Sequence, residues 1–115
     1  MQDGEPRHSI YGTTLTDWIA QVPAELKADA VGLFQPVVAG TEGFGLDGIQ
    51  LDDFVRRCIV ALLDAGAVPT IALDNRWPRA PGYNGSSEEI ASQIVGQWRR
   101  GEIRADHDGL WFVKH

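Results

Sequence analysis

The sequence predicts an α+β domain in which about three helices pack on one face of a small, mainly antiparallel sheet. Two segments, 51–65 and 86–100, carry apolar residues at the three-and-four spacing of a helical face. Two others, 68–73 and 110–114, are rich in β-branched and aromatic residues and have strand character. Because a chain of 115 residues is typical of one core, we expect a single domain over residues 1–115.

Proline and glycine shape what is expected of the N-terminal third. Residues 1–12 lack a periodic apolar pattern, so we expect a loose arm that packs little. A short helix is expected to start at Thr14 or Thr16, and Pro23 either begins a second short helix or ends the first. Segment 31–38 contains a proline, which favours an edge strand over a helix there.

The segment 51–65 is the clearest helix. Its apolar face is continuous, and on the other side acidic residues precede basic ones by four positions. Asp52 precedes Arg56 and Asp53 precedes Arg57, an order that stabilises a helix by about 0.2–0.5 kcal/mol per pair.

The C-terminal part is expected to hold a second capped helix and a hairpin. Ser86, followed three residues later by Glu89, has the spacing of a capping box at the start of the helix 86–100. Segments 102–105 and 110–114 flank a polar four-residue turn, so we expect the chain to end in a β-hairpin.

The order of a helix, a strand, a second helix and a terminal hairpin also resembles that of a winged-helix domain, which is the alternative fold. There the second helix enters the major groove of DNA. The first turn of the helix 86–100 contains two glutamates, which phosphate would repel. Winged-helix DNA binding is therefore the third functional hypothesis, and the outer residues that would contact bases are Gln93, Gln97 and Arg100.

Composition restricts the class of partner and the compartment. Ten basic and sixteen acidic residues give a net charge of −6, the wrong sign for a nucleic-acid-binding protein. The single cysteine, Cys58, cannot form an internal disulfide, and no signal-peptide pattern opens the chain, so we expect a cytoplasmic protein. No stretch approaches the roughly 18 apolar residues of a membrane span, and we expect no membrane partner.

The segment 43–48 matches the GxGxxG pattern of dinucleotide-binding loops. Four residues separate it from the preceding apolar segment, whereas a phosphate loop must follow its strand directly. Asp47, Asp52 and Asp53 would also place negative charge where phosphates bind. We therefore expect a flexible loop here and no cofactor.

The segment 106–108, Asp-His-Asp, offers metal ligands or an acid–base pair, which His8 or His115 would complete. A polar turn explains the same residues, and both other histidines lie near the chain ends, so we expect no metal site. Cys58 lies on the apolar stripe of its helix, as a small buried hydrophobe would, rather than a nucleophile. No catalytic motif is present elsewhere, and we expect no catalytic residue.

Three aromatic residues are the most suggestive of function: Trp77, Tyr83 and Trp111. Aromatic side chains on loops and strand faces are favoured at the centres of protein interfaces. A lid that folds back over the core explains Trp77 and Tyr83 equally well. The run from Leu110 to Val113 is apolar on both faces of its strand, and if that strand lies at an edge, a second copy can pair with it.

These patterns predict a non-catalytic domain that binds another protein or itself, through the loop 74–85 and the strand 110–114. The acidic charge would suit an inhibitor- or immunity-type protein with a basic target. The alternative is a small-molecule-binding protein or enzyme, with a pocket under the loop lined by Asp74, Trp77, Tyr83 and Trp98. The first hypothesis selects as contact residues Trp77, Tyr83, Leu110, Trp111 and Val113.

Overall fold

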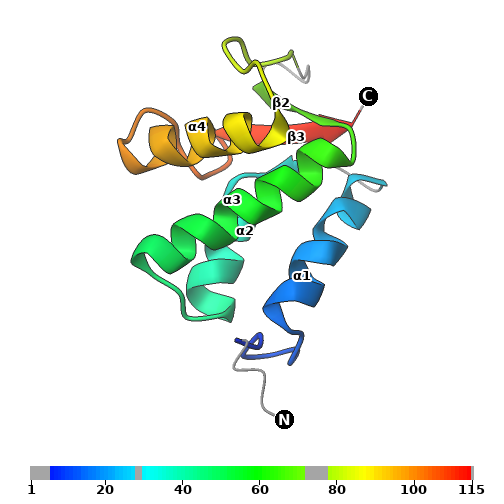
Figure 1. Ribbon diagram of the computed structural model, residues 1–115, viewed down its shortest axis with the longest axis vertical. Helices are drawn as coiled ribbons and strands as arrows, with labels where there is room; N and C mark the ends of the chain where they lie inside the picture. The colour runs from blue at the N-terminus through cyan, green and yellow to red at the C-terminus, as the bar shows by residue number, and fades with distance from the viewer. Residues whose placement is uncertain (1–5, 28–29, 72–77, 115) are drawn as a thin grey trace.

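The computed structural model describes residues 6–27, 30–71 and 78–114 and confirms the α+β class, with helices and a small antiparallel sheet (Figure 1). Its helices are α1 (Leu15–Gln21), α2 (Phe34–Val38), α3 (Gly48–Asp64) and α4 (Ser87–Arg99), with a 3-10 segment, η1 (Val22–Lys27), and a π-helical turn, η2 (Ala39–Gly43). Its strands are β1 (Val31–Gly32), β2 (Ala67–Ile71) and β3 (Leu110–Lys114). Within the described ranges, each helix is too short or too polar to span a membrane.

The last strand of the chain is the middle strand of the sheet. The order is β1–β3–β2, both pairs are antiparallel, and Phe112 lies opposite both Val31 and Pro69. Paired residues point to the same face of an antiparallel sheet. Phe112, Val31 and Pro69 are buried, so this is the face that meets the helices.

The expected C-terminal hairpin does not form, because β3 pairs with β1 and β2 instead of with segment 102–105. Residues 100–109 are turns and bends. Gly109 passes so close to Arg104 that an added Cβ would lie 1.8 Å from the Arg104 carbonyl oxygen, so this turn requires glycine at position 109. The winged-helix alternative needs such a hairpin as its wing, and the described residues do not provide one.

Segment 31–38 is only partly the edge strand that its proline suggested. Val31 and Gly32 form β1, and the chain then turns into the short helix α2. Pro36 lies in the first turn of α2, where a backbone N–H has no partner within the helix and its loss costs little.

Loop residues cover the outer edge of β2. The Ile71 N–H donates to the Pro78 carbonyl at 3.1 Å, and the Ala80 N–H donates to the Pro69 carbonyl at 2.9 Å. The Pro69 carbonyl points away from β3, and the backbone nitrogen of a strand residue points to the same side as its carbonyl. The N–H that proline lacks would therefore not have bonded to β3, and the β2–β3 pairing loses no hydrogen bond.

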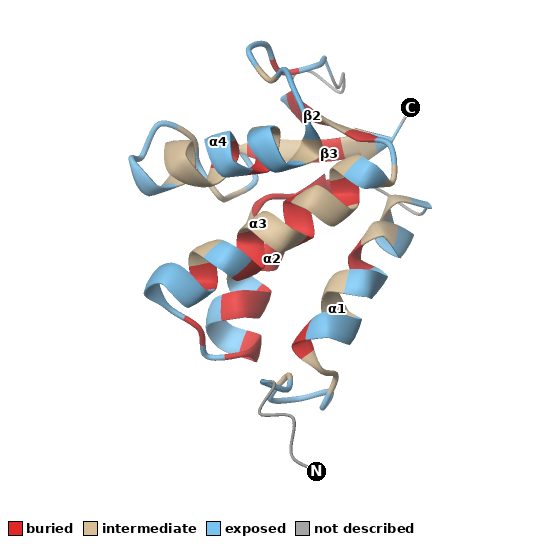
Figure 2. Cartoon of the chain, in the orientation of Figure 1, coloured by how far each residue is buried: buried red, intermediate tan, exposed pale blue. Residues whose placement is uncertain are grey.

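The helix α3 forms the centre of the core. It contacts α1, η1, α2, α4 and β2. Figure 2 shows its buried stripe facing inward. The predicted apolar residues of this stripe are at most 5% exposed: Leu51, Phe54, Val55, Cys58, Ile59 and Leu62. The apolar periodicity of 51–65 thus located the core helix correctly.

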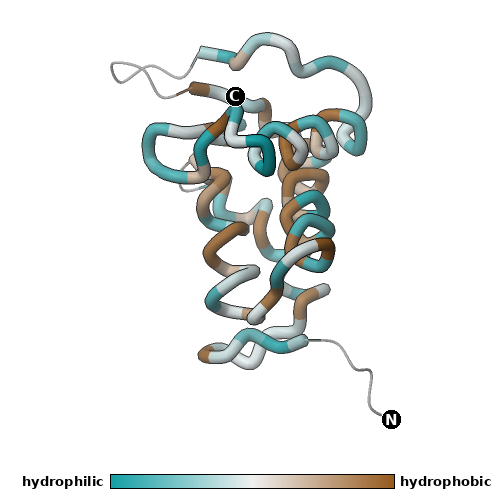
Figure 3. The backbone as a smooth tube through the Cα atoms, turned by 90° about the vertical axis from the view of Figure 1, so that its left-hand side faces the viewer, coloured by the Kyte–Doolittle hydropathy of each residue, from teal (hydrophilic) through white to brown (hydrophobic). Residues whose placement is uncertain are grey.

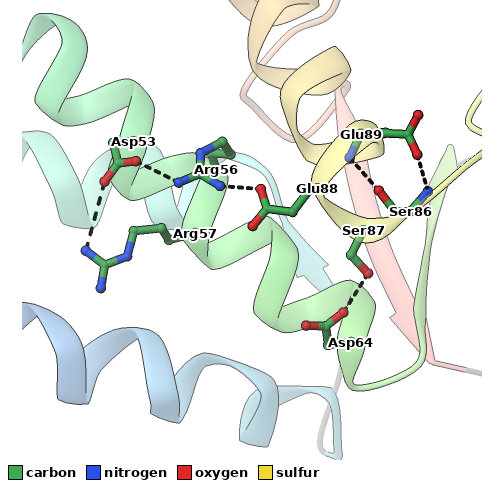
Figure 4. A network of polar contacts seen from close by, with 8 residues as sticks. All are labelled: Asp53, Arg56, Arg57, Asp64, Ser86, Ser87, Glu88 and Glu89. Atoms are coloured by element: carbon green, nitrogen blue, oxygen red, sulfur yellow. Dashed lines mark hydrogen bonds and ion pairs between the residues drawn. The ribbon is translucent and has the colours of Figure 1, made fainter.

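Charged residues of α3 form ion pairs both along their own helix and across to α4. Of the two pairs expected four positions apart, Asp53 pairs with Arg57 at 4.0 Å. Asp52 pairs with Arg99 instead of Arg56. Arg56 bonds to Asp53 at 2.7 Å and also to Glu88 of α4 (Figure 4). Each of these exposed pairs contributes at most about 1 kcal/mol, but together they orient the two helices.

Residues 6–12 do not form the expected loose arm. The His8 N–H donates to the Thr13 carbonyl at 2.8 Å, and Arg7 and Thr14 form an isolated antiparallel bridge. Thr14 then caps α1 by accepting the Asp17 N–H, as its hydroxyl predicted. Residues 1–5 of the predicted arm lie outside the described residues.

The predicted capping box of α4 is present and makes the stability of this helix depend on pH. The Ser86 N–H donates to the Glu89 carboxylate at 3.0 Å, and the Glu89 N–H donates to the Ser86 hydroxyl at 3.1 Å. The first of these bonds favours the charged carboxylate and lowers the pKa of Glu89. A lowered pKa contributes stability at neutral pH that is lost as the pH falls below the ordinary glutamate pKa of about 4.3.

We therefore predict that Glu89→Gln reduces the loss of stability between about pH 6 and about pH 3, because glutamine has no charge to titrate. The free energy of unfolding, from urea denaturation at a series of pH values, measures this loss. Glu25→Gln, at an exposed glutamate of η1, is the matched control and should lose as much stability as the wild type between these pH values. An identical pH dependence in the wild type and Glu89→Gln would contradict the role of the box.

Candidate functional site

The residues selected from the sequence are separated by the fold. Trp77 lies outside the described residues, as does Asp74. Tyr83 is partly buried, and its hydroxyl donates to the Gln97 side-chain oxygen at 2.6 Å. Burial raises the pKa of this hydroxyl. Tyr83 therefore covers the side of α4, as the lid hypothesis expected for it.

The run 110–113 does present large side chains on both faces of its strand. Leu110 and Phe112 are buried on the helix side, while Trp111 and Val113 face the other way and are partly exposed. β2 pairs with all five residues of β3, and β1 pairs with Trp111 and Phe112 on the other side. β3 is therefore the middle strand, and not the edge strand on which the expected pairing with a second copy depended.

Trp111 is held by other aromatic groups. Its ring lies edge-on to Phe34, with 5.5 Å between centroids, and its indole N–H donates to the His107 carbonyl at 3.1 Å. The His107 ring stacks on Phe34 at 4.9 Å. Trp111 therefore anchors the 106–109 turn to α2, which gives it a structural role in this fold.

The residues proposed for DNA contact are also engaged within the chain. The Gln93 amide donates to the Gly82 carbonyl at 3.1 Å, and Gln97 accepts the Tyr83 hydroxyl. Arg100 forms an ion pair with Glu102. The outer side of α4 thus holds the 82–83 loop, and reading DNA with it would require these bonds to break.

The glycine-rich segment 43–48 is a packed turn. The Phe44 N–H donates to the Ala39 carbonyl at 2.9 Å, and the Leu46 N–H donates to the Gly40 carbonyl at 2.8 Å. Both side chains are 9% exposed. Because a phosphate loop needs free backbone N–H groups, this arrangement favours the loop interpretation over a dinucleotide site, although the loop is packed rather than flexible.

The polar residues singled out for chemistry have structural contacts. Asp106 pairs with Arg104 and accepts the Asp108 N–H at 3.0 Å, which closes the turn. Cys58 is fully buried, and this burial raises the pKa of its thiol, so it packs as the small hydrophobe that was expected. Within the described ranges, no three His, Cys, Asp or Glu side chains gather as a metal site would require.

A group of exposed apolar side chains was missed by the sequence reasoning, because two of its three members lie in the segment taken for an arm. Ile10 is 78% exposed, Tyr11 75% and Val38 45%. All three line a shallow hollow of about 290 Å³ between the 8–11 turn and the end of α2. We call these three residues the apolar patch. In Figure 3 the turn that carries two of them forms the end of the molecule opposite the C-terminal strand.

A histidine fixes the turn that carries the patch. The His8 Nδ1 atom accepts the N–H groups of Ile10 at 3.2 Å and Tyr11 at 3.4 Å. The His8 ring lies 4.8 Å from the Tyr11 ring and 5.5 Å from the Phe44 ring. The Ser9 N–H donates to the Gly43 carbonyl at 2.8 Å. The turn is therefore bound to the body of the domain.

A second concavity is lined in part by the described end of the 74–85 loop. Figure 1 shows this loop at the opposite end of the molecule from the N-terminal turn. The concavity has a volume of about 340 Å³ and is lined by Tyr83 and Leu110, among others. Trp98 does not line it, and the Arg99 guanidinium covers the Trp98 ring at 4.3 Å. Of the residues expected to line a pocket under the loop, Tyr83 lines this concavity and Trp98 does not, while Asp74 and Trp77 lie outside the described residues.

We predict that Gly43→Ala releases the N-terminal turn. An added Cβ would lie 2.5 Å from the His8 ring, which its two backbone hydrogen bonds prevent from moving away cheaply. Such overpacking costs about 1–3 kcal/mol. Hydrogen exchange at the Ser9 N–H, measured by NMR, should become faster.

Gly96→Ala is the matched control, since its Cβ meets only the flexible Arg100 side chain. It should keep the exchange rate of Ser9 and slightly stabilise α4. Unchanged stability and Ser9 protection in Gly43→Ala would show that the turn is not docked on Gly43.

Comparison of the chain with protein-family models, with curated proteins and with solved structures finds no match. Its function therefore has to be inferred from the residues described above.

Proposed function

We propose that the protein is a non-catalytic protein-interaction domain and that the apolar patch, Ile10, Tyr11 and Val38, is its contact surface. The observation that carries this proposal is the exposure of Ile10 and Tyr11, at 78% and 75%, on a hydrogen-bonded turn. Neither side chain belongs to the buried core or packs against it, so core packing does not account for two large apolar side chains at these positions.

Pre-organisation supports the proposal. A partner that binds a flexible arm must spend binding free energy on ordering it. Here the backbone is already ordered by His8, by the Ser9–Gly43 bond and by the bridge between Arg7 and Thr14. Tyrosine is also a residue type that often contributes strongly at the centres of interfaces.

Charge indicates the class of partner. The chain carries a net charge of −6, and Glu42 lines the hollow beside the patch. A basic protein surface would approach this domain faster than an acidic one. We therefore propose a basic partner, which is compatible with the inhibitor- or immunity-type function expected from composition, though through a different surface from the one expected.

We predict that the double substitution Ile10→Ser with Tyr11→Ser weakens partner binding by at least about 1 kcal/mol, because the loss of the two side chains leaves the contact without its apolar centre. The double variant, used as bait in an extract of the native cells, should capture less of the partner protein than the wild type does. Light scattering on the same variants tests whether the partner is a second copy.

Ile49→Ser is the matched control, since Ile49 is 86% exposed but lies on α3, away from the patch. It should capture the same proteins as the wild type. If the double variant, checked for retained fold, binds the same proteins to the same extent, the patch is not the contact surface.

A second candidate function is the binding of a small molecule in the pocket under the loop. Its volume, about 340 Å³, is at the lower end of the range of ligand sites. Saturable shifts of the amide signals of residues that line it, on addition of apolar probe compounds, would support this function. The absence of any shift would exclude it.

A further inference from the structure

The pocket under the loop is lined mainly by apolar and aromatic residues. It lies between the loop at 80–83, the turn at 102–104 and the adjoining ends of β2 and β3. The apolar and aromatic residues of its wall are Ile71, Ala80, Pro81, Tyr83, Ile103 and Leu110. Ile71 is 42% exposed, so the pocket leaves a large aliphatic side chain in contact with water. An apolar group that filled the pocket would remove this surface from solvent.

Three charged residues also line the pocket, and their partners differ. Glu102 is paired with Arg100, and Arg104 is paired with Asp106 at 2.5 Å. The carboxylate of Asp108 forms no hydrogen bond or ion pair with any residue in the described ranges. Among the charged side chains of the wall, it is thus the one whose charge is not balanced by a partner.

We propose that this pocket binds a small organic cation, an ammonium group on an apolar body, with the body against the wall and the ammonium at Asp108. The inference rests on the second candidate function and names its ligand class. An anionic ligand would face two carboxylates, Glu102 and Asp108, and would have to compete with Asp106 for Arg104. A cation instead supplies the partner that Asp108 lacks.

The test is an NMR titration of the full chain with three probes of matched apolar body: phenylbutylamine, phenylbutanol and phenylbutyrate. All three should shift the amide signals of Ile103, Gly109 and Leu110. Because Asp108 is exposed, phenylbutylamine should bind only about two- to fivefold more tightly than phenylbutanol, and phenylbutyrate should bind most weakly. Added salt should reduce the difference.

Two variants distinguish the contribution of the Asp108 charge to binding from that of the apolar wall. Asp108→Asn should abolish the preference for the amine and leave the binding of the alcohol unchanged. Ile71→Ser, at a partly exposed wall residue, should weaken all three probes, whereas Ile49→Ser on α3 should weaken none. The fold of each variant is checked from its amide spectrum.

The outcomes distinguish the ligand class from the pocket itself. The cation proposal is overturned, while a ligand pocket remains, by any of three results. These are equal affinities for the three probes, tightest binding of phenylbutyrate, or a preference for the amine that survives Asp108→Asn. If none of the probes shifts these signals at millimolar concentration, the second candidate function fails together with it.

Discussion

The pairing of β3 on both sides is the interaction on which the rest of the structure depends. β1 and β2 each pair with β3 and not with each other, so the sheet exists only when the C-terminal segment lies between them. The same strand inserts Phe112, fully buried, into the core formed with α3. β1 lies in the N-terminal half of the chain and β3 at its C-terminal end, so segments from opposite halves must meet before β1 is stable.

This pairing also decides which surfaces are free for recognition. β2 pairs with the whole of β3, β1 pairs with its middle, and Trp111 packs on Phe34, so the apolar run 110–113 has most of its contacts within the chain. The two surfaces proposed for recognition lie at opposite ends of a molecule 47 Å long. At one end is the patch around Ile10 and Tyr11, and at the other is the pocket beside Leu110.

The sequence predicted those elements whose signals are local. The apolar period of α3, the capping box of α4 and the Thr14 cap of α1 all lie within a few residues of the helices they define. The hairpin was wrong because strand pairing is decided by distant segments. β1 has only two residues, and nothing in its sequence indicates that it pairs with β3. The N-terminal turn was missed for the same reason, since Gly43 holds it from far along the chain. Of the proposed contact residues, Tyr83 lies beside a pocket under the loop, as the small-molecule hypothesis expected, whereas Leu110 was expected at an interface and lines that pocket instead.

The position of β3 is tested most directly by native-state hydrogen exchange of its backbone amides, measured at two protein concentrations. If β3 is the central strand, the amides of Leu110–Lys114 should exchange only through global unfolding, with a protection that does not depend on concentration. Fast exchange along Leu110–Lys114, or protection that disappears on dilution, would mean that this strand is an edge that pairs with another molecule.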